Sequence, residues 1–203
     1  RSIVVIKIKF KNPSKPMLYL KELYDNALKN DQKFPEACAI SSIDKLSSEV
    51  DSRFVNIKYV FDDSLVFFSN YDSPKGIQFQ SHNIVSALFF WSSIYVQIRM
   101  KAKIIKTDEA FSDEHFYKRS DSKNILAIVS EQSKEIDSYQ SIVKKYENFK
   151  NMGNKITRPK NWGGYKIKPF YIEFWKGHDS RINKREGFYM ESNHDWRKKI
   201  LQP

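Results

Sequence analysis

An alternating pattern in the middle of the chain constrains the fold more than any other feature. Apolar residues at Val96, Ile98, Met100 and Ala102 alternate with polar ones. Successive side chains of a strand point to opposite faces, so this pattern predicts one buried face and one face that meets water or a ligand. Turn-forming Asp, Ser and Pro residues separate similar short apolar runs. We therefore expect consecutive strands over residues 53–105.

The flanking regions add helices to this sheet. Apolar residues three and four positions apart predict amphipathic helices, and acidic residues mark the start of one of them. The expected strands cover residues 37–43, 54–61, 65–69, 84–91, 95–105, 170–175, 187–191 and 196–201. The expected helices cover residues 16–30, 76–82, 108–119, 125–129 and 134–149. Short strands that close on themselves, with helices at the ends, indicate the α+β class and an antiparallel β-barrel.

The length of 203 residues suits one domain of ordinary size. We expect an N-terminal segment with a helix over residues 1–34 and a single domain over residues 35–203, without an internal repeat. The single Cys38 excludes an intramolecular disulfide and favours a reducing, cytoplasmic location. No apolar run approaches the roughly 20 residues of a membrane-spanning helix, so no membrane partner is expected.

Basic residues exceed acidic ones, with 35 Lys and Arg against 24 Asp and Glu and a formal net charge of +11. A basic surface attracts polyanions, which leaves a nucleic-acid-binding module as an alternative. The basic residues are spread along the chain, however, with acids such as Asp113 and Glu114 between them. A phosphorylated small ligand accounts for part of the excess, and the leading hypothesis below has no nucleic-acid partner.

Motifs for metals and for phosphate loops are missing. The four histidines have no partner at metal-ligand spacing and no Cys pair exists, so no metal site is expected. No glycine-rich loop of the G-x-G-x-x-G or Walker type occurs. Side chains would therefore hold a phosphate, and Arg53, Lys58 and Lys75 lie at predicted strand ends or in neighbouring turns. Any one of them alone could equally be a solvated surface cation.

The stretch from Asn161 to Arg185 concentrates aromatic residues, a glycine pair and arginines. A glycine pair permits close backbone approach, and this mixture suits a flat aromatic ligand that carries a phosphate. Each aromatic residue alone could be an ordinary core residue. Their spacing, however, forms three motifs: R-P-x-x-W-G-G-Y from Arg158, E-F-W-x-G from Glu173, and R-I-x-x-R from Arg181. Together these motifs resemble the C-terminal signature of the pyridoxine/pyridoxamine 5′-phosphate oxidase family.

The resemblance runs from about residue 35 to residue 203 and implies a split barrel that binds FMN. The segment 53–58 is similar to the family's R-x-V-L-L-K strand, whose Arg meets the flavin phosphate and whose Lys faces the substrate. The segments 67–70, 73–75 and 129–133 are similar to F-Y-T-N, S-R-K and V-S-x-Q-S. It also implies a homodimer with each FMN at the subunit interface. The implied FMN-binding residues are Arg53, Val55, Lys58, Phe68, Ser69, Lys75, Gln97, Gln132, Ser133, Trp175 and Arg185.

The implied substrate site departs from the family at informative positions. In the family, Tyr, Arg and Ser side chains hold the substrate phosphate, and the corresponding residues here, His115, Arg119 and Lys123, are more cationic. The family's R-L-H-x-R motif has Asn183 in place of the His. Asn cannot carry a proton charge, so the substrate or the rate is expected to differ. Pro74 replaces the Arg of S-R-K, which predicts weaker FMN retention. The implied substrate-binding residues are Lys58, His115, Arg119, Lys123, Arg181 and Asn183, and the last two are the implied catalytic residues.

The leading hypothesis is an FMN-dependent oxidase that converts pyridoxine or pyridoxamine 5′-phosphate to pyridoxal 5′-phosphate and reduces oxygen to hydrogen peroxide. In such an enzyme the cofactor carries the redox chemistry, and the protein supplies placement and electrostatics. One alternative is a related flavin oxidase for another aromatic substrate, which the His-to-Asn change favours. A second alternative is a binding module without catalysis, either for FMN or for nucleic acid.

Overall fold

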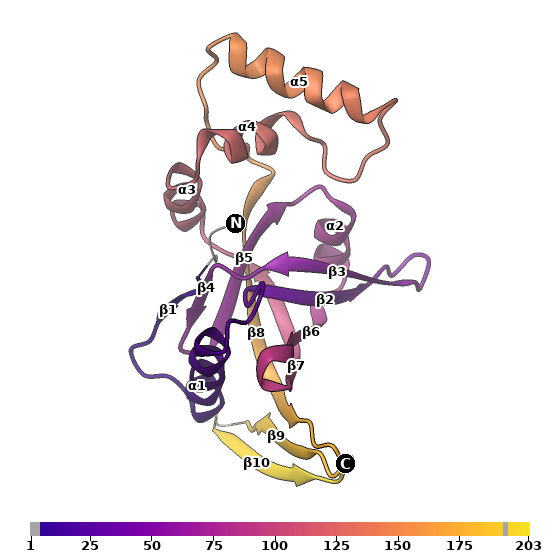
Figure 1. Ribbon diagram of the computed structural model, residues 1–203. Coiled ribbons are helices and arrows are strands. Elements are labelled where there is room, and N and C mark those ends of the chain that lie inside the picture. Colours follow the sequence, from indigo (N-terminus) through magenta and orange to yellow (C-terminus); the bar gives the residue numbers. More distant parts are fainter. Residues whose placement is uncertain (1–4, 193–194) are drawn as a thin grey trace.

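The computed structural model describes residues 5–192 and 195–203. Within them, ten strands belong to one curled sheet, and helices lie at its ends and along one side (Figure 1). The strands are β1 (Lys7–Lys9), β2 (Ala37–Ile43), β3 (Val50–Asn56), β4 (Tyr59–Phe61), β5 (Ser64–Asn70), β6 (Ile84–Trp91), β7 (Val96–Lys106), β8 (Trp162–Lys176), β9 (Lys184–Met190) and β10 (Trp196–Leu201). The helices are α1 (Lys15–Lys29), α2 (Pro74–Ser81), the short 3-10 turn η1 (Ser92–Ile94), α3 (Glu109–Tyr117), α4 (Asp121–Val129) and α5 (Tyr139–Asn151).

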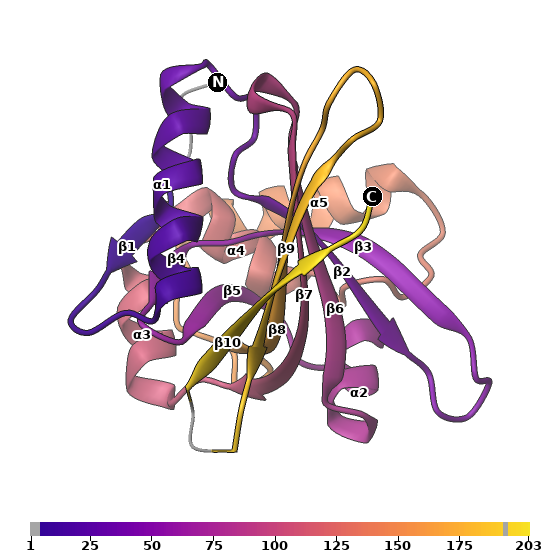
Figure 2. The same ribbon diagram turned by 90° about the horizontal axis from the view of Figure 1, so that it is seen from below.

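Strand β8 organises the sheet because its two halves have different partners. One edge pairs with β7 from Tyr165 to Lys176, whereas the other edge pairs first with β5 and then with β9. The sheet order is β1-β4-β5-β8-β7-β6-β2-β3, and the β9–β10 hairpin branches from β8. Figure 2, seen from the hairpin end, shows the hairpin lying across the other strands. This forked and curled sheet with peripheral helices is the predicted α+β split barrel.

The predicted strand at residues 170–175 is too short, because β8 begins at Trp162. Glycines weaken a strand pattern, and the Gly163-Gly164 pair hid the first half of the strand. The pair leaves room for the protein's own side chains. A Cβ atom on Gly163 would lie 2.1 Å from the Tyr71 hydroxyl oxygen, and one on Gly164 would lie 2.5 Å from Thr107 Oγ1.

The predicted strand over residues 54–61 is in fact two strands, β3 and β4. The backbone N–H of Ile57 donates to Glu36 O at 2.9 Å, next to β2, and the N–H of Lys58 donates to Val66 O at 2.7 Å, on β5. The chain therefore changes partners between these two residues. The residue types show no break because Ile57 and Lys58 are not turn residues. This change of partner leaves Lys58 at the junction between the two parts of the sheet.

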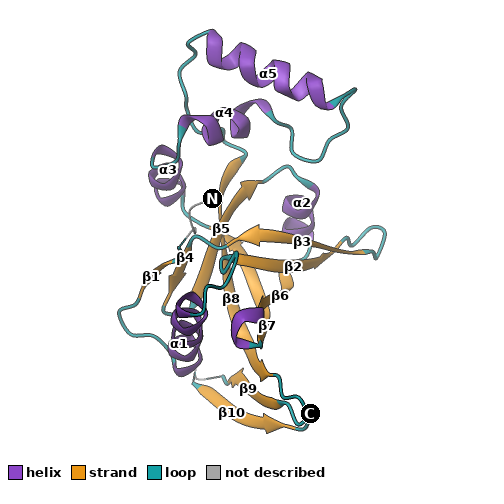
Figure 3. Cartoon of the chain, in the orientation of Figure 1, coloured by secondary structure: helices purple, strands orange, loops and turns teal. Residues whose placement is uncertain are grey.

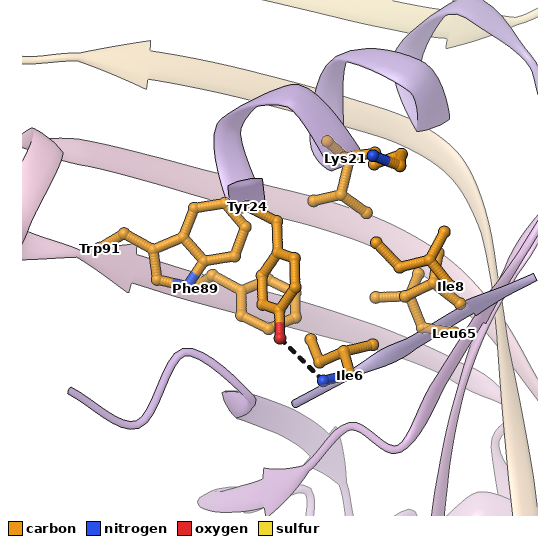
Figure 4. A pocket seen from close by; sticks show the side chains of 9 residues that line it. Ile6, Ile8, Lys21, Tyr24, Leu65, Phe89 and Trp91 are labelled. Atoms are coloured by element: carbon orange, nitrogen blue, oxygen red, sulfur yellow. Dashed lines mark hydrogen bonds between the residues drawn. The ribbon is translucent and has the colours of Figure 1, made fainter. Parts of the chain in front are cut away.

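The N-terminal segment adds a strand that the sequence did not indicate. Strand β1 pairs with β4 in parallel, so the sheet is mixed rather than fully antiparallel. Helix α1 confirms the predicted helix at 16–30 and packs against the sheet. Its Tyr24 hydroxyl accepts a hydrogen bond from the Ile6 backbone N–H at 2.7 Å, in the core between α1, β1 and β6 (Figure 4). A void of about 10 Å³ remains there, which is too small for any ligand.

The helices from α3 to α5 gather at one end of the molecule, and the β9–β10 hairpin lies at the opposite end (Figure 3). Helix α3 is close to its predicted bounds, with the Asp108 side chain capping it by accepting from Phe111 N–H at 2.7 Å. Helix α4 starts earlier than predicted, and α5 starts at Tyr139 rather than at residue 134. Ser138 caps α5 and so determines its start. In the described ranges, no helix is long and apolar enough to cross a membrane.

Candidate functional site

A cleft of about 850 Å³ opens between β3, β5 and the helices α2 to α4. This volume suits a small-molecule ligand or cofactor. Eleven of the residues predicted to bind FMN or substrate line this cleft, and they come from five helices and strands and from the links next to them. They are Arg53, Val55, Lys58, Phe68, Ser69, Lys75, His115, Arg119, Lys123, Gln132 and Ser133.

Three of the predicted cofactor residues contact one another directly. The Gln132 side-chain oxygen accepts from Ser69 Oγ at 3.1 Å and from Lys75 Nζ at 3.0 Å. Lys75 is in the first turn of α2, where Ser73 is the N-cap and Pro74 occupies the first helical position. Proline is favoured at that position, so Pro74 has a local structural reason to replace the family's Arg. These contacts place an ammonium group, a hydroxyl and an amide together at the end of β5.

Contacts with neighbouring side chains hold Arg53 in place at the cleft. Its guanidinium donates to Ser42 Oγ at 2.6 Å and to Gln78 Oε1 at 3.1 Å, and it lies 3.6 Å from Asp51. Burial lowers the pKa of Arg53, and burial together with the Arg53 charge lowers the pKa of Lys75 to about 8. The two cations are therefore close enough to repel each other. A phosphate between them would relieve this repulsion.

His115 is part of an aromatic platform at the other side of the cleft. Its ring stacks on Phe68 with a centroid distance of 3.7 Å, and Phe68 stacks on Trp162 at 5.4 Å. The Tyr59 hydroxyl lies 3.0 Å from His115 Nδ1. Burial and the neighbouring cations, foremost Arg119, lower the pKa of His115 to about 3. At neutral pH this imidazole is uncharged.

Arg119 has an incomplete set of hydrogen bonds. Its guanidinium lies 4.4 Å from the centre of the Trp162 ring, and Nη2 donates to Lys123 O at 3.0 Å. Its Nη1 atom is buried and has no hydrogen-bond partner. Burial lowers the pKa of Arg119. A buried donor without a partner is costly, so this atom calls for an anionic or polar ligand.

Cations dominate the whole cleft. Its lining includes six Lys and Arg residues and, among the described residues, no Asp or Glu. Two of the six, Lys118 and Lys123, are exposed, and Lys118 was not among the predicted site residues. A cleft with one sign of charge attracts ligands of the opposite sign. The lining therefore suits a ligand with one or more phosphate groups.

Three other predicted cofactor residues lie on a different part of the sheet. Gln97 of β7 pairs with Trp175 of β8, and Trp175 pairs with Arg185 of β9. The three residues form one row across the sheet and are partly exposed. Trp162 and Trp175 belong to one predicted ligand-binding stretch, but they lie 13 positions apart on strand β8. At roughly 3.3 Å per residue, a straight strand would hold them about 40 Å apart.

The two predicted catalytic residues, Arg181 and Asn183, are in the loop between β8 and β9. The Asn183 side-chain oxygen accepts from the His178 backbone N–H at 3.0 Å and closes this loop. Arg181 adopts a left-handed backbone with φ of 63° and is exposed. The loop lies beside the C-terminus, at the end of the molecule opposite to α3, α4 and α5 (Figure 1). One chain therefore does not bring these residues to the cleft.

Two residues that the sequence did not single out for a role contact predicted site residues. Tyr59 contacts His115, and its only signal was an aromatic residue next to the motif 53–58. Glu173 belongs to the E-F-W motif, and the structure shows that it binds Arg185. Across residues 5–192 and 195–203, no group of three or more His, Cys, Asp or Glu residues is arranged to hold a metal ion.

Two family models match different parts of the chain. The model described as "Pyridoxamine 5′-phosphate oxidase" matches residues 28–153, and the one described as "Pyridoxine 5′-phosphate oxidase C-terminal dimerisation region" matches residues 162–203. The chain belongs to the pyridoxamine 5′-phosphate oxidase family. The first match contains all eleven cleft residues and Gln97, and the second match contains Trp175, Arg181, Asn183 and Arg185.

Curated relatives agree with this assignment, and solved structures show the same fold. A pyridoxine/pyridoxamine 5′-phosphate oxidase of Legionella pneumophila is 33% identical over 196 residues, which cover 93% of this chain and 87% of the relative. One of Cytophaga hutchinsonii is 40% identical over 149 residues, covering 71% and 69%. The fold is similar to that of PhzG from Burkholderia lata, solved in complex with tetrahydrophenazine-1-carboxylic acid, with a TM-score of 0.88, 24% identity and 94% coverage of both chains. An FMN-binding protein of Nostoc punctiforme shares the fold with a TM-score of 0.73 and 13% identity, covering 90% of this chain and 97% of that one.

Proposed function

We propose that the protein is an FMN-dependent oxidase that converts pyridoxine or pyridoxamine 5′-phosphate to pyridoxal 5′-phosphate. The observation that carries this proposal is the cationic cleft, which is lined by eleven of the residues predicted to bind FMN or substrate and, among the described residues, by no Asp or Glu. The curated relatives named above have this activity in their names. In the reaction the substrate loses two hydrogens and oxygen gains them as hydrogen peroxide. The amine substrate also takes up water and releases ammonia.

The cleft fits FMN by the chemistry of its donors. Arg53 and Lys75 would hold the phosphate, with Ser69, Gln132 and Ser133 as hydrogen-bonding partners. The unrelieved repulsion between the two cations supports this assignment, since a dianion between them would stabilise both. When bound, FMN supplies the redox chemistry by accepting a hydride and passing the electrons to oxygen.

The other end of the cleft would hold the substrate phosphate. Lys58, Arg119 and Lys123 supply charge, and the buried Nη1 of Arg119 supplies a donor that has no protein partner. His115 would act as a neutral donor. A Tyr59 hydroxyl that donates to Nδ1 leaves the imidazole proton on Nε2, from which it can bind a phosphate oxygen. The stacked rings of His115, Phe68 and Trp162 form an apolar wall at this end.

A homodimer would complete the site. Gln97, Trp175, Arg181, Asn183 and Arg185 are remote from the cleft of their own chain, so we propose that they reach the cleft of a second copy. The matched dimerisation region, which contains four of these five residues, supports this arrangement. Arg181 and Asn183 would then orient the pyridine ring. Asn183 has no titratable proton, so orientation rather than proton transfer is its role.

One experiment tests the cofactor and the substrate in turn. The protein is titrated with FMN, unbound FMN is removed, and pyridoxine 5′-phosphate is added without oxygen while flavin absorbance is followed. We expect FMN to bind and its absorbance to bleach. A protein that cannot be loaded with FMN contradicts both flavin hypotheses, and steep salt-dependent retention of DNA would then favour a nucleic-acid-binding module.

A second candidate is a flavin oxidase for another aromatic substrate. The Asn183 side chain favours it, because it closes its own loop where the family motif has a His. Under this alternative the loaded protein binds pyridoxine 5′-phosphate, yet the flavin absorbance stays unchanged without oxygen. The same experiment therefore separates the two candidates.

A further inference from the structure

A buried carboxylate lies at the centre of the second set of residues. Glu173 of β8 is only 2% exposed. It accepts hydrogen bonds from Arg99 Nε at 2.7 Å, from Arg185 Nε at 2.8 Å and from the Tyr171 hydroxyl at 2.6 Å. Arg99 Nη2 adds a further contact at 2.7 Å. Both oxygens of the carboxylate are therefore in use.

The register of the sheet explains why one carboxylate reaches two arginines. Arg99 on β7 is directly opposite Glu173, and Arg185 on β9 is its diagonal neighbour. The residue directly opposite on β9 is Gly187, where an added Cβ would lie 3.2 Å from the Tyr189 ring. The absence of a side chain at Gly187 leaves space for Arg185 to turn toward Glu173.

These contacts keep the group charged despite its burial. Burial alone would raise the pKa of Glu173, but the hydrogen bonds from Arg185, Tyr171 and Arg99 lower it to about 2. The same contacts raise the pKa of Arg99 and of Arg185. Arg185 is also held at Nη1, which donates to the Gln202 backbone oxygen at 2.9 Å. Two of its three guanidinium nitrogens are thus fixed by the protein.

We propose that Glu173 is a positioning residue that fixes the Arg185 guanidinium in the orientation that contacts FMN. Glu173, Trp175 and Arg185 lie on the same face of the sheet, because strand residues two apart share a face. Arg185 has a long side chain with several rotatable bonds, and an anchored guanidinium loses less entropy on binding. This role rests on the proposed function, in which Arg185 contacts FMN.

The variant Glu173→Gln separates positioning from simple electrostatics. The substitution removes one negative charge near the flavin. If only this charge mattered, FMN would bind more tightly and the flavin midpoint potential would become more positive. If Arg185 loses its position, FMN binds more weakly and the midpoint potential becomes more negative. We expect FMN affinity, followed by flavin fluorescence, to fall about tenfold and the midpoint potential to become more negative.

A double-mutant cycle tests whether Glu173 acts through Arg185. In an Arg185→Met background, Glu173→Gln should change FMN affinity less than about twofold, because the group that it positions is gone. Glu186→Gln is the matched control. Glu186 is another buried carboxylate, bound to Lys184 and Lys198, but it pairs with Phe174 in the sheet and faces the other side. Its substitution should leave FMN affinity unchanged.

The outcomes distinguish this inference from the proposed function. A folded wild-type protein that does not bind FMN overturns both. A wild-type protein that binds FMN, with a Glu173→Gln variant that binds it equally or more tightly, overturns only the role of Glu173. If Glu173→Gln does not fold, Glu173→Asp keeps the charge but shortens the reach to Arg185. A folded Asp variant with wild-type FMN affinity would likewise overturn the inference.

Discussion

The cations near one end of β8 have lowered pKa values, whereas those near the other end have raised pKa values. In the cleft, burial lowers the pKa of Arg53, Lys75 and Arg119, and no acidic residue among the described ones lines the space. At the other end, Glu173 raises the pKa of Arg99 and Arg185 by binding both. The first set has only Asp51, 3.6 Å from Arg53, as a counter-charge and suits phosphate groups. The second set has its counter-charge built in, so it can contact a neutral ring without needing an anion.

The largest effect is expected from replacing Arg119, whose buried Nη1 atom has no hydrogen-bond partner among the described residues. Arg119→Met should lower kcat/KM for pyridoxine 5′-phosphate on the order of 10²–10³-fold, because it removes a buried charge that pairs with the substrate phosphate. FMN affinity should change little. Steady-state kinetics and FMN titration measure the two effects.

The exposed Lys118 at the rim of the same cleft is the control for this substitution. Lys118→Met should cost less than about fivefold in kcat/KM, because an exposed charge is screened by solvent. Equal effects of the two substitutions would show that only the overall field matters and that the partnerless Arg119 atom has no special role.

The next effect is a pH dependence that is specific to the cleft. Lys75 has a pKa of about 8 in the ligand-free protein, and a bound phosphate would raise it. FMN affinity should therefore fall as the pH rises past 8, by about tenfold between pH 7 and pH 9. Fluorescence titration at several pH values measures this. A Lys75→Met variant, although a weaker binder, should lack this dependence, and an equal slope in that variant would assign the titration to another group.

A smaller effect tests whether two chains share each site. Arg119→Met lies in the cleft and Arg185→Met lies on β9, so each variant alone should lose most activity. When both are co-expressed, about half of randomly assembled dimers are mixed, and each mixed dimer holds one intact site. The mixture should therefore recover about a quarter of wild-type activity, measured on purified protein. If mixed dimers form but recover nothing, the site is complete within one chain.

The smallest effect concerns the stability of the ligand-free protein. The folded-state pKa of Lys75 lies below its usual value of 10.5, so its burial destabilises the fold at pH 7 and this cost disappears as the pH rises from about 8 to 10.5. Lys75→Met should raise the free energy of unfolding at pH 7 by roughly 1 kcal/mol. Urea unfolding at pH 7 and pH 10 measures this. A stabilisation that is the same at both values would contradict the electrostatic explanation.

Several elements were predictable because local patterns determine them. The alternation at 96–102 identified β7, and the three-and-four spacing identified α1. The break between β3 and β4 was not predictable, because two non-turn residues change partners there and only the hydrogen bonds to Glu36 and Val66 reveal it. Strand β1 was missed for a related reason. Three residues are too short for a pattern, and their pairing with β4 depends on the rest of the sheet.

The sequence by itself determined the family and the barrel and singled out the candidate site residues, because these depend on residue types and their spacing. Tertiary structure decided how those residues are grouped. A long strand holds its two ends far apart, so motifs that are close in sequence occupy opposite ends of the molecule. The tertiary structure also decided which cations are paired with a carboxylate. Glu173 reaches Arg99 and Arg185 only through the register of β7, β8 and β9, whereas the buried Nη1 of Arg119 has no hydrogen-bond partner among the described residues.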